Sequence, residues 1–196
     1  ESNRVLIIDA LTGGENQLSN LAEARDTQTM ISLLQRDPEV FDVLDAGTTM
    51  RFLTAYAAVT NKHKKLTGTP RMCERPIGIL VDALRSIGAR IDYLKNEGFP
   101  PLQIQGFDQQ ISKKLSIRGD VSSQYISAIL MIAPVLPEGL EVEVTGKIGS
   151  RTYIQMTLEL MRQFGISYTW EGNIIGIGPQ KYQPTAYTVE SDWSGA

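Results

Sequence analysis

Internal repetition restricts the fold of this 196-residue sequence more than any other feature. Residues 67–91 and 145–168 each contain a Thr-Gly pair, a polar loop that carries arginine, a helical pattern and a glycine. Gly88 and Gly165 end the two helical patterns, and glycine is the residue best suited to a left-handed helix C-cap. Two copies of one pattern predict two copies of one structural unit.

A second pair of helical patterns, at 48–59 and 122–134, precedes the first pair, and both are apolar on most faces. Helices that are apolar all round are buried. Alternating or β-branched segments between the helices predict strands. The predicted strands are 115–117, 140–144, 174–177 and 187–189. Each unit is therefore predicted to run strand, helix, strand, helix and then a pair of strands.

The N-terminal part follows the same plan in shortened form, with helices at 3–11 and 27–34. We predict a single α/β (α+β) domain over 1–196, in which three units surround a buried helical centre. The predicted units cover 1–44, 45–120 and 121–189. A doubly wound sheet is the alternative, but the sequence has no Gly-rich dinucleotide fingerprint between a strand and a helix.

Composition limits the chemistry. One cysteine and one histidine exclude an internal disulfide and a His/Cys metal site, although carboxylate-bound magnesium stays open. A Ser-His-Asp or Cys-His mechanism would depend on His63, whose polar neighbours predict a solvated loop. The formal charge of −3 argues against general nucleic-acid binding but allows a small anion at a local Arg cluster. No apolar run is long enough to span a membrane.

Two predicted helices start with residues suited to anions. Residues 45–51 form a Gly-hydroxyl turn before a buried helix, and residues 122–124, Ser-Ser-Gln, occupy the corresponding place in the next unit. Free N–H groups and the helix dipole attract anions there. The alternative is ordinary capping, by Thr48 or Thr49 in the first case and by a serine in the second.

Two further loops place arginine before a helix. Residues 69–78 carry Arg71 and Arg75 between two prolines, and residues 149–153 carry a serine, an arginine and a tyrosine. Arginine binds carboxylate or phosphate through two parallel hydrogen bonds, although such arginines are often solvated surface residues. Cys73 has no nearby base signature, so we interpret it as an inert thiol. No paired carboxylates for acid–base catalysis are evident.

Five motifs in the same order resemble the 5-enolpyruvylshikimate-3-phosphate (EPSP) synthase family along essentially the whole chain. They are Ser-Asn-Arg at 2–4, Asp-Ala-Gly-Thr-x-x-Arg at 45–51, Thr-Gly-x-Pro-Arg-Met-x-Glu-Arg-Pro-Ile-Gly at 67–78, Val-Ser-Ser-Gln at 121–124, and Ser150 with Tyr153. The resemblance implies one half of a two-domain inside-out barrel, each half built from three βαβαββ units with pseudo-threefold symmetry. It also implies helix N-termini that face a central cleft.

The resemblance implies transfer of the enolpyruvyl group of phosphoenolpyruvate to the 5-hydroxyl of shikimate-3-phosphate, by addition and elimination, in the shikimate pathway of aromatic amino acid biosynthesis. No metal or cofactor is implied, and the parent enzyme is expected to be a cytoplasmic monomer that binds neither nucleic acid nor membrane. The implied shikimate-3-phosphate ligands are Arg4, Ser122, Ser123, Gln124, Ser150 and Tyr153. The implied phosphoenolpyruvate ligands are Gly47, Thr48, Arg71 and Gln124.

Some positions depart from the family pattern. Asp45 replaces an Asn, Phe52 a common Pro and Cys73 a usual Lys. The opening Lys-Ser is absent, the first unit is short, and residues 190–196 are expected to lead towards a missing second domain that holds the acid–base carboxylates. We therefore expect no catalytic residue in this half and no activity from it alone. Gly47 is the small residue expected to face glyphosate in sensitive enzymes.

Three other interpretations remain. The related transferase that acts on UDP-N-acetylglucosamine shares the fold, but the motifs at 67–78 and 121–124 favour shikimate-3-phosphate. A non-catalytic anion-binding module would have no second domain of similar repeats. An RNA-end-processing protein with a similar unit fits poorly with the acidic balance.

Overall fold

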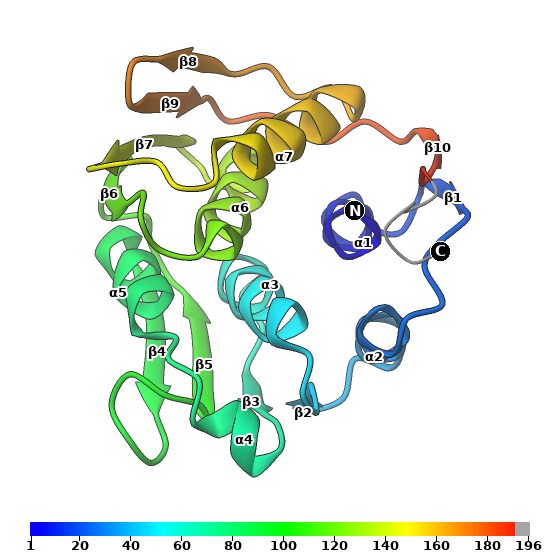
Figure 1. Cartoon of the computed structure of the whole chain (residues 1–196), viewed down its shortest axis with the longest axis vertical. Helices are drawn as coiled ribbons and strands as arrows, with labels where there is room; N and C mark the ends of the chain where they lie inside the picture. The colour runs from blue at the N-terminus through cyan, green and yellow to red at the C-terminus, as the bar shows by residue number, and fades with distance from the viewer. Residues whose placement is uncertain (191–196) are drawn as a thin grey trace.

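A computed structural model describes residues 1–190 of the chain. The last predicted segment, 190–196, lies outside the described residues except for Glu190. Three inner helices form the centre, namely α1 (Ser2–Leu11), α3 (Gly47–Val59) and α6 (Ser123–Ile132), the last continued by the short turn η1 (Ala133–Val135). Nearly every residue of α3 and α6 is buried, because these helices are apolar on most faces. Figure 1 views the three helices almost end-on.

Three outer helices surround the inner ones (Figure 1). They are α2 (Arg25–Arg36), α5 (Gly78–Ile87) and α7 (Arg151–Gln163). Helix α2 contacts α1 and α3, α5 contacts α3 and α6, and α7 contacts α6 and α1. Each outer helix thus lies between two inner ones, which confirms the predicted pseudo-threefold arrangement around a buried centre. None of the helices within residues 1–190 is long and apolar enough to cross a bilayer.

Two four-stranded sheets cover the helices. One has the order β2-β3-β5-β4, from β2 (Val40–Asp42), β3 (Lys64–Thr67), β4 (Ala89–Tyr93) and β5 (Leu102–Phe107). The other has the order β6-β7-β9-β8, from β6 (Lys114–Arg118), β7 (Leu140–Thr145), β8 (Thr169–Glu171) and β9 (Ile174–Ile177). In each sheet the first two strands are parallel and the other pairs antiparallel. This is the predicted βαβαββ unit, present twice.

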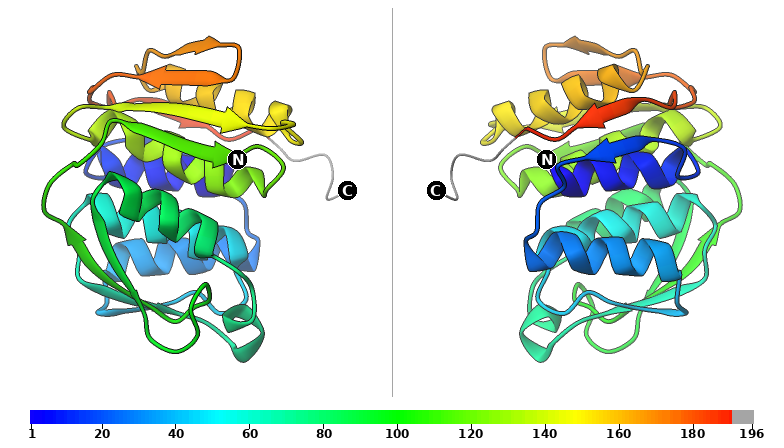
Figure 2. Two further views of the ribbon diagram at one scale, coloured as in Figure 1. Left: turned by 90° about the vertical axis from the view of Figure 1, so that its left-hand side faces the viewer. Right: turned by 90° about the vertical axis from the view of Figure 1, so that its right-hand side faces the viewer.

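Strand pairing corrects the predicted unit boundaries. Strand β2 pairs with β3, and β6 pairs with β7, so the second and third units each begin one strand earlier than 45 and 121. Strand β10 (Ala186–Thr188), predicted to belong to the third unit, pairs in parallel with β1 (Gln17–Ser19) of the first. Figure 2 shows these two strands, red and blue, side by side. The pairing partner of a strand is not local information. The pattern along the chain therefore assigned 115–117 and 187–189 to the wrong units, and it did not predict β2.

The first unit lacks the last strand pair of the other two units. Its sheet has two strands, β1 and β10, within the part of the chain that the structure describes. Its helices, α1 and α2, occupy the same places as the inner and outer helices of the other units. The expected shortening of this unit therefore corresponds to a missing terminal hairpin.

Both predicted glycine caps are in place. Gly88 has φ +123° and Gly165 has φ +87°, a region that disfavours residues with a Cβ. A Cβ at Gly88 would also lie 2.1 Å from the backbone oxygen of Gln109. These two positions fix how the chain leaves α5 and α7.

Candidate anion-binding site

The inner helices begin close together at one end of the molecule. Gln124, in the first turn of α6, donates from Nε2 to Oγ1 of Thr48, in the first turn of α3, at 2.8 Å. Arg4, in the first turn of α1, reaches α6 and α7 through its side chain. No side chain caps the N-terminus of α1, α3 or α7 within the described residues. Their first N–H groups and dipole ends are therefore available to an anion.

The capping interpretation of Thr48 and Thr49 is wrong. The residue at the N-cap of α3 is Ala46, which offers no side-chain acceptor. Thr48 accepts from Gln124, and Thr49 donates to the backbone oxygen of Asp26 at 3.3 Å. The start of α3 is thus left open, as an anion site requires.

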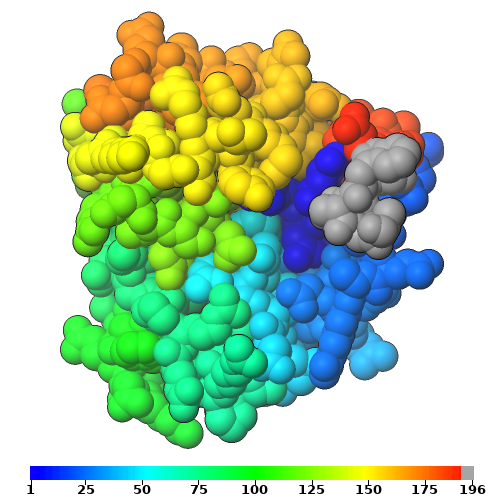
Figure 3. Space-filling view, viewed as in Figure 1, coloured from blue at the N-terminus to red at the C-terminus, as the bar shows by residue number. Residues whose placement is uncertain are grey.

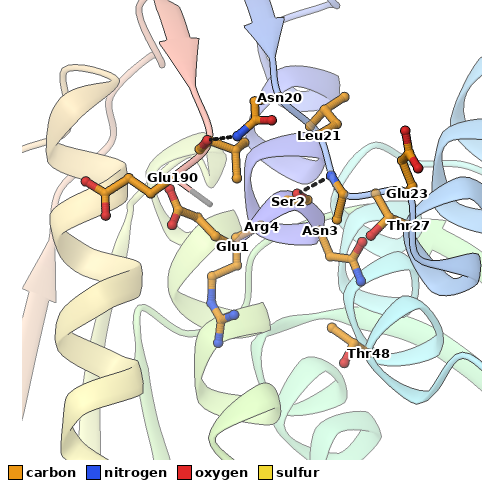
Figure 4. A pocket seen from close by; sticks show the side chains of 12 residues that line it. Glu1, Ser2, Asn3, Arg4, Asn20, Leu21, Glu23, Thr27, Thr48 and Glu190 are labelled. Atoms are coloured by element: carbon orange, nitrogen blue, oxygen red, sulfur yellow. Dashed lines mark hydrogen bonds between the residues drawn. The ribbon is translucent and has the colours of Figure 1, made fainter. Parts of the chain in front are cut away.

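A cavity of about 490 Å³ opens beside the first turn of α1 (Figure 4). Arg4 and Thr48 both line it. Its other polar side chains are Glu1, Ser2, Asn3, Asn20, Glu23, Thr27 and Glu190. Figure 3 shows the dark blue start of α1 recessed between the yellow α7 and the blue α2. A ligand in this hollow would meet the Arg4 cation and several carboxylates.

Arg4 is a buried cation with defined partners. Only 8% of the residue is exposed, Nε donates to Oγ1 of Thr157 at 2.8 Å, and Nη2 donates to Oγ of Ser127 at 3.2 Å. The guanidinium lies 5.5 Å from the ring centre of Phe52, the residue that replaces the family's proline. Burial lowers the pKa of Arg4, although Tyr153 and Glu1 act to raise it. Because Arg4 is buried and has no ion pair within residues 1–190, its charge is costly and therefore suited to an anionic partner.

Sequence reasoning missed the two hydroxyl residues that hold Arg4. Ser127 and Thr157 are both fully buried, on α6 and α7. The only signal in the sequence is a hydroxyl among apolar residues of a buried helical pattern. That signal does not say which neighbouring helix the hydroxyl meets.

Gln124 joins two helices at the centre of the site. Its Oε1 accepts from Nη1 of Arg51 at 2.9 Å, and its Nε2 donates to Thr48. Arg51 is 8% exposed, its guanidinium lies 5.2 Å from the ring centre of Tyr125, and its Nε is buried without a partner in the described residues. The motif at 45–51 contained Arg51, but sequence reasoning gave it no role. Its contact with Gln124 fixes the amide so that the NH₂ points to Thr48.

The two serines before Gln124 differ in role. Ser122 Oγ accepts from the backbone N–H of Gln124 at 3.3 Å, which confirms the capping interpretation for this residue. As a hydroxyl it still has its own hydrogen to donate. Ser123 makes no side-chain hydrogen bond within residues 1–190, so it is free to meet a ligand.

The loop that was predicted before α5 contains a short helix, α4 (Pro70–Cys73). Thr69 caps it by accepting from the backbone N–H of Met72 at 3.3 Å, and the Thr69 hydroxyl also bonds to a carboxylate oxygen of Asp45. The negative charge of Asp45 therefore ties the entrance of α3 to α4. Cys73 is partly buried, and its thiol lies 3.8 Å from the backbone oxygen of Gly68.

Arg71 and Arg75 line a second cavity of about 540 Å³, together with Asp45 and Met72. Both arginines are exposed, and neither makes a side-chain hydrogen bond or ion pair within the described residues. The Arg75 guanidinium lies directly over Gly47, where an added Cβ would be 2.4 Å from Nη1. Gly47 thus allows Arg75 to approach the start of α3.

Ser150 and Tyr153 stand at the entrance of α7. Ser150 is the N-cap residue, makes no side-chain capping bond and is partly exposed. Tyr153 is 53% exposed and close enough to Arg4 to act on its pKa. Within residues 1–190, no hydrogen bond joins the side chain of Ser150, Tyr153 or Arg71 to Gln124. The structure thus brings three of the predicted site residues together: Arg4 and Thr48 line one cavity, and Gln124 bonds to Thr48. The other predicted site residues lie around these three.

Among residues 1–190, no group of three His, Cys, Asp or Glu side chains could hold a metal ion.

The fold and site define a protein of repeated βαβαββ units whose inner helices begin close together, beside several arginines. A family model described as EPSP synthase (3-phosphoshikimate 1-carboxyvinyltransferase) matches residues 35–196. The chain belongs to the EPSP synthase family, and the resemblance of the five motifs is confirmed.

Similar proteins agree with this assignment. A 3-phosphoshikimate 1-carboxyvinyltransferase of Bacteroides fragilis (strain YCH46) is 54% identical over 196 residues, which are 100% of this chain and 48% of that protein. The one of Cupriavidus taiwanensis is 40% identical over 225 residues, 100% of this chain and 52% of that protein. The solved EPSP synthase of Acinetobacter baumannii matches with a TM-score of 0.80 at 21% identity, over 97% of this chain and 48% of that one, and shows the fold. The chain spans about half the length of the curated relatives it matches.

Proposed function

We propose that this chain is the shikimate-3-phosphate-binding half of an enzyme that transfers the enolpyruvyl group of phosphoenolpyruvate to the 5-hydroxyl of shikimate-3-phosphate. One observation carries the proposal: Arg4, Thr48 and Gln124 meet where three buried helices begin. A buried cation, a hydroxyl and an amide at helix N-termini suit a small ligand that carries both negative charges and hydroxyl groups.

Shikimate-3-phosphate has a phosphate, a carboxylate and free hydroxyls, and this half offers a partner for each. Ser122, Ser123 and Ser150 are hydroxyl donors at the starts of α6 and α7, where the helix dipoles favour a phosphate. Arg4 supplies positive charge from its buried position in α1, and the exposed phenol of Tyr153 lies near it. The Gln124 amide reaches a ring hydroxyl as a donor or an acceptor.

Phosphoenolpyruvate is placed on the other side of Gln124. The open backbone of Gly47 and Thr48 faces its negative groups at the start of α3. Arg71 then meets its phosphate or carboxylate from the α4 loop. Because Gln124 bonds to Thr48 and stands in the first turn of α6, it lies between the two substrates.

The proposed reaction proceeds by addition and elimination. A proton is added to C3 of phosphoenolpyruvate while the 5-hydroxyl oxygen attacks C2 and loses its own proton, giving a tetrahedral intermediate. Phosphate then leaves as C3 loses a proton, which restores the enol double bond. In this proposal the present chain binds and orients both substrates, and carboxylates of a second domain move the protons. Holding the reacting atoms together is a large part of catalysis for such a two-substrate step.

The proposal includes a second domain in the same polypeptide, a monomeric parent enzyme and a cytoplasmic location. It includes no cofactor, nucleic acid or membrane partner. Light scattering during size-exclusion chromatography of the full-length polypeptide, in which the second domain continues this chain, tests the monomer. A mass of twice the polypeptide would reject that part.

Calorimetric titration of this chain with shikimate-3-phosphate tests the binding role. We expect saturable heat that weakens in Arg4→Ala and Ser123→Ala. Arg90→Ala and Ser116→Ala are matched controls, because both residues are exposed on strands outside the site. Equal affinities in all five proteins would reject the acceptor site.

The full-length polypeptide tests the reaction. Release of phosphate from phosphoenolpyruvate should require shikimate-3-phosphate. Release that responds instead to UDP-N-acetylglucosamine would assign the related transferase, and no release with either acceptor would favour a non-catalytic anion-binding module.

A further inference from the structure

Two hydroxyl side chains lie fully buried between the helices behind the site. Ser127 on α6 and Thr157 on α7 are both 0% exposed. The chain neighbours of Ser127 on α6 include Ile126, Ala128 and Ile129, which are apolar and buried. A buried hydroxyl is costly unless its hydrogen bonds are satisfied, so the partners of these two groups decide what they do.

The hydrogen-bond geometry gives each hydroxyl hydrogen one place. Thr157 Oγ1 lies 2.9 Å from the backbone oxygen of Tyr153, which can only accept, so Thr157 donates there. Ser127 Oγ lies 2.9 Å from Thr157 Oγ1, and Ser127 must donate in this contact because the Thr157 hydrogen is already used. Both oxygens then present lone pairs to Arg4. They accept from its Nε at 2.8 Å and its Nη2 at 3.2 Å.

These two bonds use one edge of the Arg4 guanidinium. Nε and Nη2 point at Thr157 and Ser127, and the ring of Phe52 lies beneath the group at 5.5 Å. Nη1 makes no hydrogen bond within residues 1–190. Two bonds on an edge and a ring on a face fix both the position and the plane of the cation. The remaining donors are left for the cavity that Arg4 lines with Thr48.

We infer that Ser127 and Thr157 are positioning residues that orient Arg4 for the anionic acceptor. The inference rests on the proposed function, in which Arg4 binds shikimate-3-phosphate. An arginine side chain has several rotatable bonds, and ordering it upon binding reduces affinity. Because the hydroxyl pair orders it in advance, loss of the pair should weaken acceptor binding although neither hydroxyl touches the acceptor.

The competing explanation is that the pair only fastens α6 to α7. In that case its loss would lower stability and leave ligand affinities unchanged. Affinities for the two substrates separate the explanations, because Arg4 acts on shikimate-3-phosphate and is not assigned to phosphoenolpyruvate.

The test uses the full-length polypeptide with Thr157→Val, which keeps the shape and removes the hydroxyl, and with Thr157→Ser, which restores it. We expect the Val variant to raise the Kd and KM for shikimate-3-phosphate about tenfold, as for loss of one hydrogen bond to a charged group. The KM for phosphoenolpyruvate should change less than about twofold, and the Ser variant should lie within about twofold of the original protein. Thr54→Val is the matched control, since Thr54 is also 0% exposed but donates only within α3, to the backbone oxygen of Met50.

An Arg4→Ala background gives the sharpest result. There Thr157→Val should change acceptor affinity by less than about twofold, because the group that it positions is gone. Unchanged acceptor affinity in Thr157→Val, or an equal loss with and without Arg4, overturns the inference. If the Val variant does not fold, Ser127→Ala takes its place with the same expectations. Failure of the unmodified protein to bind shikimate-3-phosphate would instead reject the proposed function.

Discussion

Arg4 on one side of the site, and Arg71 with Arg75 on the other, differ in how firmly their side chains are held. Arg4 is buried, with two hydroxyl acceptors and an aromatic ring around it. Arg71 and Arg75 are exposed and have no hydrogen bond or ion pair in the described residues. One cation is therefore ordered before any ligand arrives, and the other two become ordered only when a ligand or another part of the protein meets them. Binding by ordered groups costs less entropy.

The difference follows from where each arginine stands. Arg4 belongs to the inner helix α1, which contacts α2, α3, α6 and α7, so its surroundings are fixed by packing. Arg71 and Arg75 belong to a four-residue helix and the turn after it, between Pro70 and Pro76. Prolines stiffen the backbone of this turn but do not hold the ends of long side chains. The fold thus holds the arginine on the proposed acceptor side rigidly and leaves the arginines on the proposed phosphoenolpyruvate side adaptable.

The largest expected effect is that of replacing the ordered cation. Arg4→Met should weaken shikimate-3-phosphate binding by the full-length polypeptide about 100-fold, or roughly 3 kcal/mol, because a buried charge that pairs with an anion is removed. Arg71→Met should weaken phosphoenolpyruvate binding about tenfold at most, since an exposed side chain pays its ordering cost on binding. Calorimetry measures both, with Arg90→Met as the control. An Arg71 effect as large as that of Arg4 would remove the distinction between the two groups.

The second effect concerns Gln124, whose side chain bonds to Arg51 and Thr48. Gln124→Leu should lower the free energy of unfolding by about 2 kcal/mol, because Arg51 would lose its bond at Nη1 while its Nε is already unpartnered. Urea denaturation measures this.

Gln124→Glu separates folding from binding. The carboxylate still accepts from Arg51, so stability should stay within about 1 kcal/mol. Its negative charge should nevertheless weaken binding of both anionic substrates. Equal destabilisation by Leu and Glu would show that the contact with Arg51 does not support the fold.

The sequence predicted the helices of this site well, for physical reasons. Residues 48–59 and 122–134 are apolar on most faces, and only a buried helix satisfies such a pattern. Gly47, Thr48 and Gln124 were correctly predicted to lie at helix starts, because short motifs mark such starts locally. Arg4 was singled out only by resemblance, and its role as a ligand stays a prediction, since nothing in its own helix marks it.

Other features could not be predicted because they depend on distant parts of the chain. Ser127 and Thr157 gain their role only when α6 and α7 are placed against α1. Strand β10 gains its partner β1 from the opposite end of the sequence. Helix α4 was missed because a helix of four residues is too short to show a helical period.

A third charged region lies outside the site and shows what charge alone contributes to stability. Asp37 pairs with Lys62 at 2.8 Å and with Lys64 at 3.1 Å. Burial acts to raise the pKa of Asp37, but hydrogen bonds from the two lysines outweigh it and hold the pKa below its usual value. A carboxylate with a lowered pKa stabilises the fold above its unfolded pKa, and this contribution disappears as the pH falls through the folded value.

Asp37→Asn should therefore lower the free energy of unfolding by about 0.5 kcal/mol at neutral pH, as for an exposed ion pair. Asparagine tolerates the positive φ of 46° at this position, so the change isolates the charge. The difference from the original protein should shrink as the pH falls below about 4. Urea denaturation at several pH values measures it, and a constant difference would mean that the charge is not the cause. Binding of either substrate should not change.

The smallest expected effect tests how firmly the guanidinium of Arg75 is held in its position over Gly47. In Gly47→Ala the new Cβ would lie 2.4 Å from Nη1 of Arg75, so the guanidinium must move. Arg75 has no hydrogen bond or ion pair in the described part of the chain, so we expect its guanidinium to move aside. The free energy of unfolding should then change by no more than about 0.5 kcal/mol, with alanine favouring the helix. If Arg75 were held as firmly as Arg4, the overlap would cost about 1–3 kcal/mol, as in an overpacked core. Thermal and urea denaturation decide between these values, and Arg75→Ala with Gly47→Ala serves as control, because removal of the guanidinium should abolish any such cost.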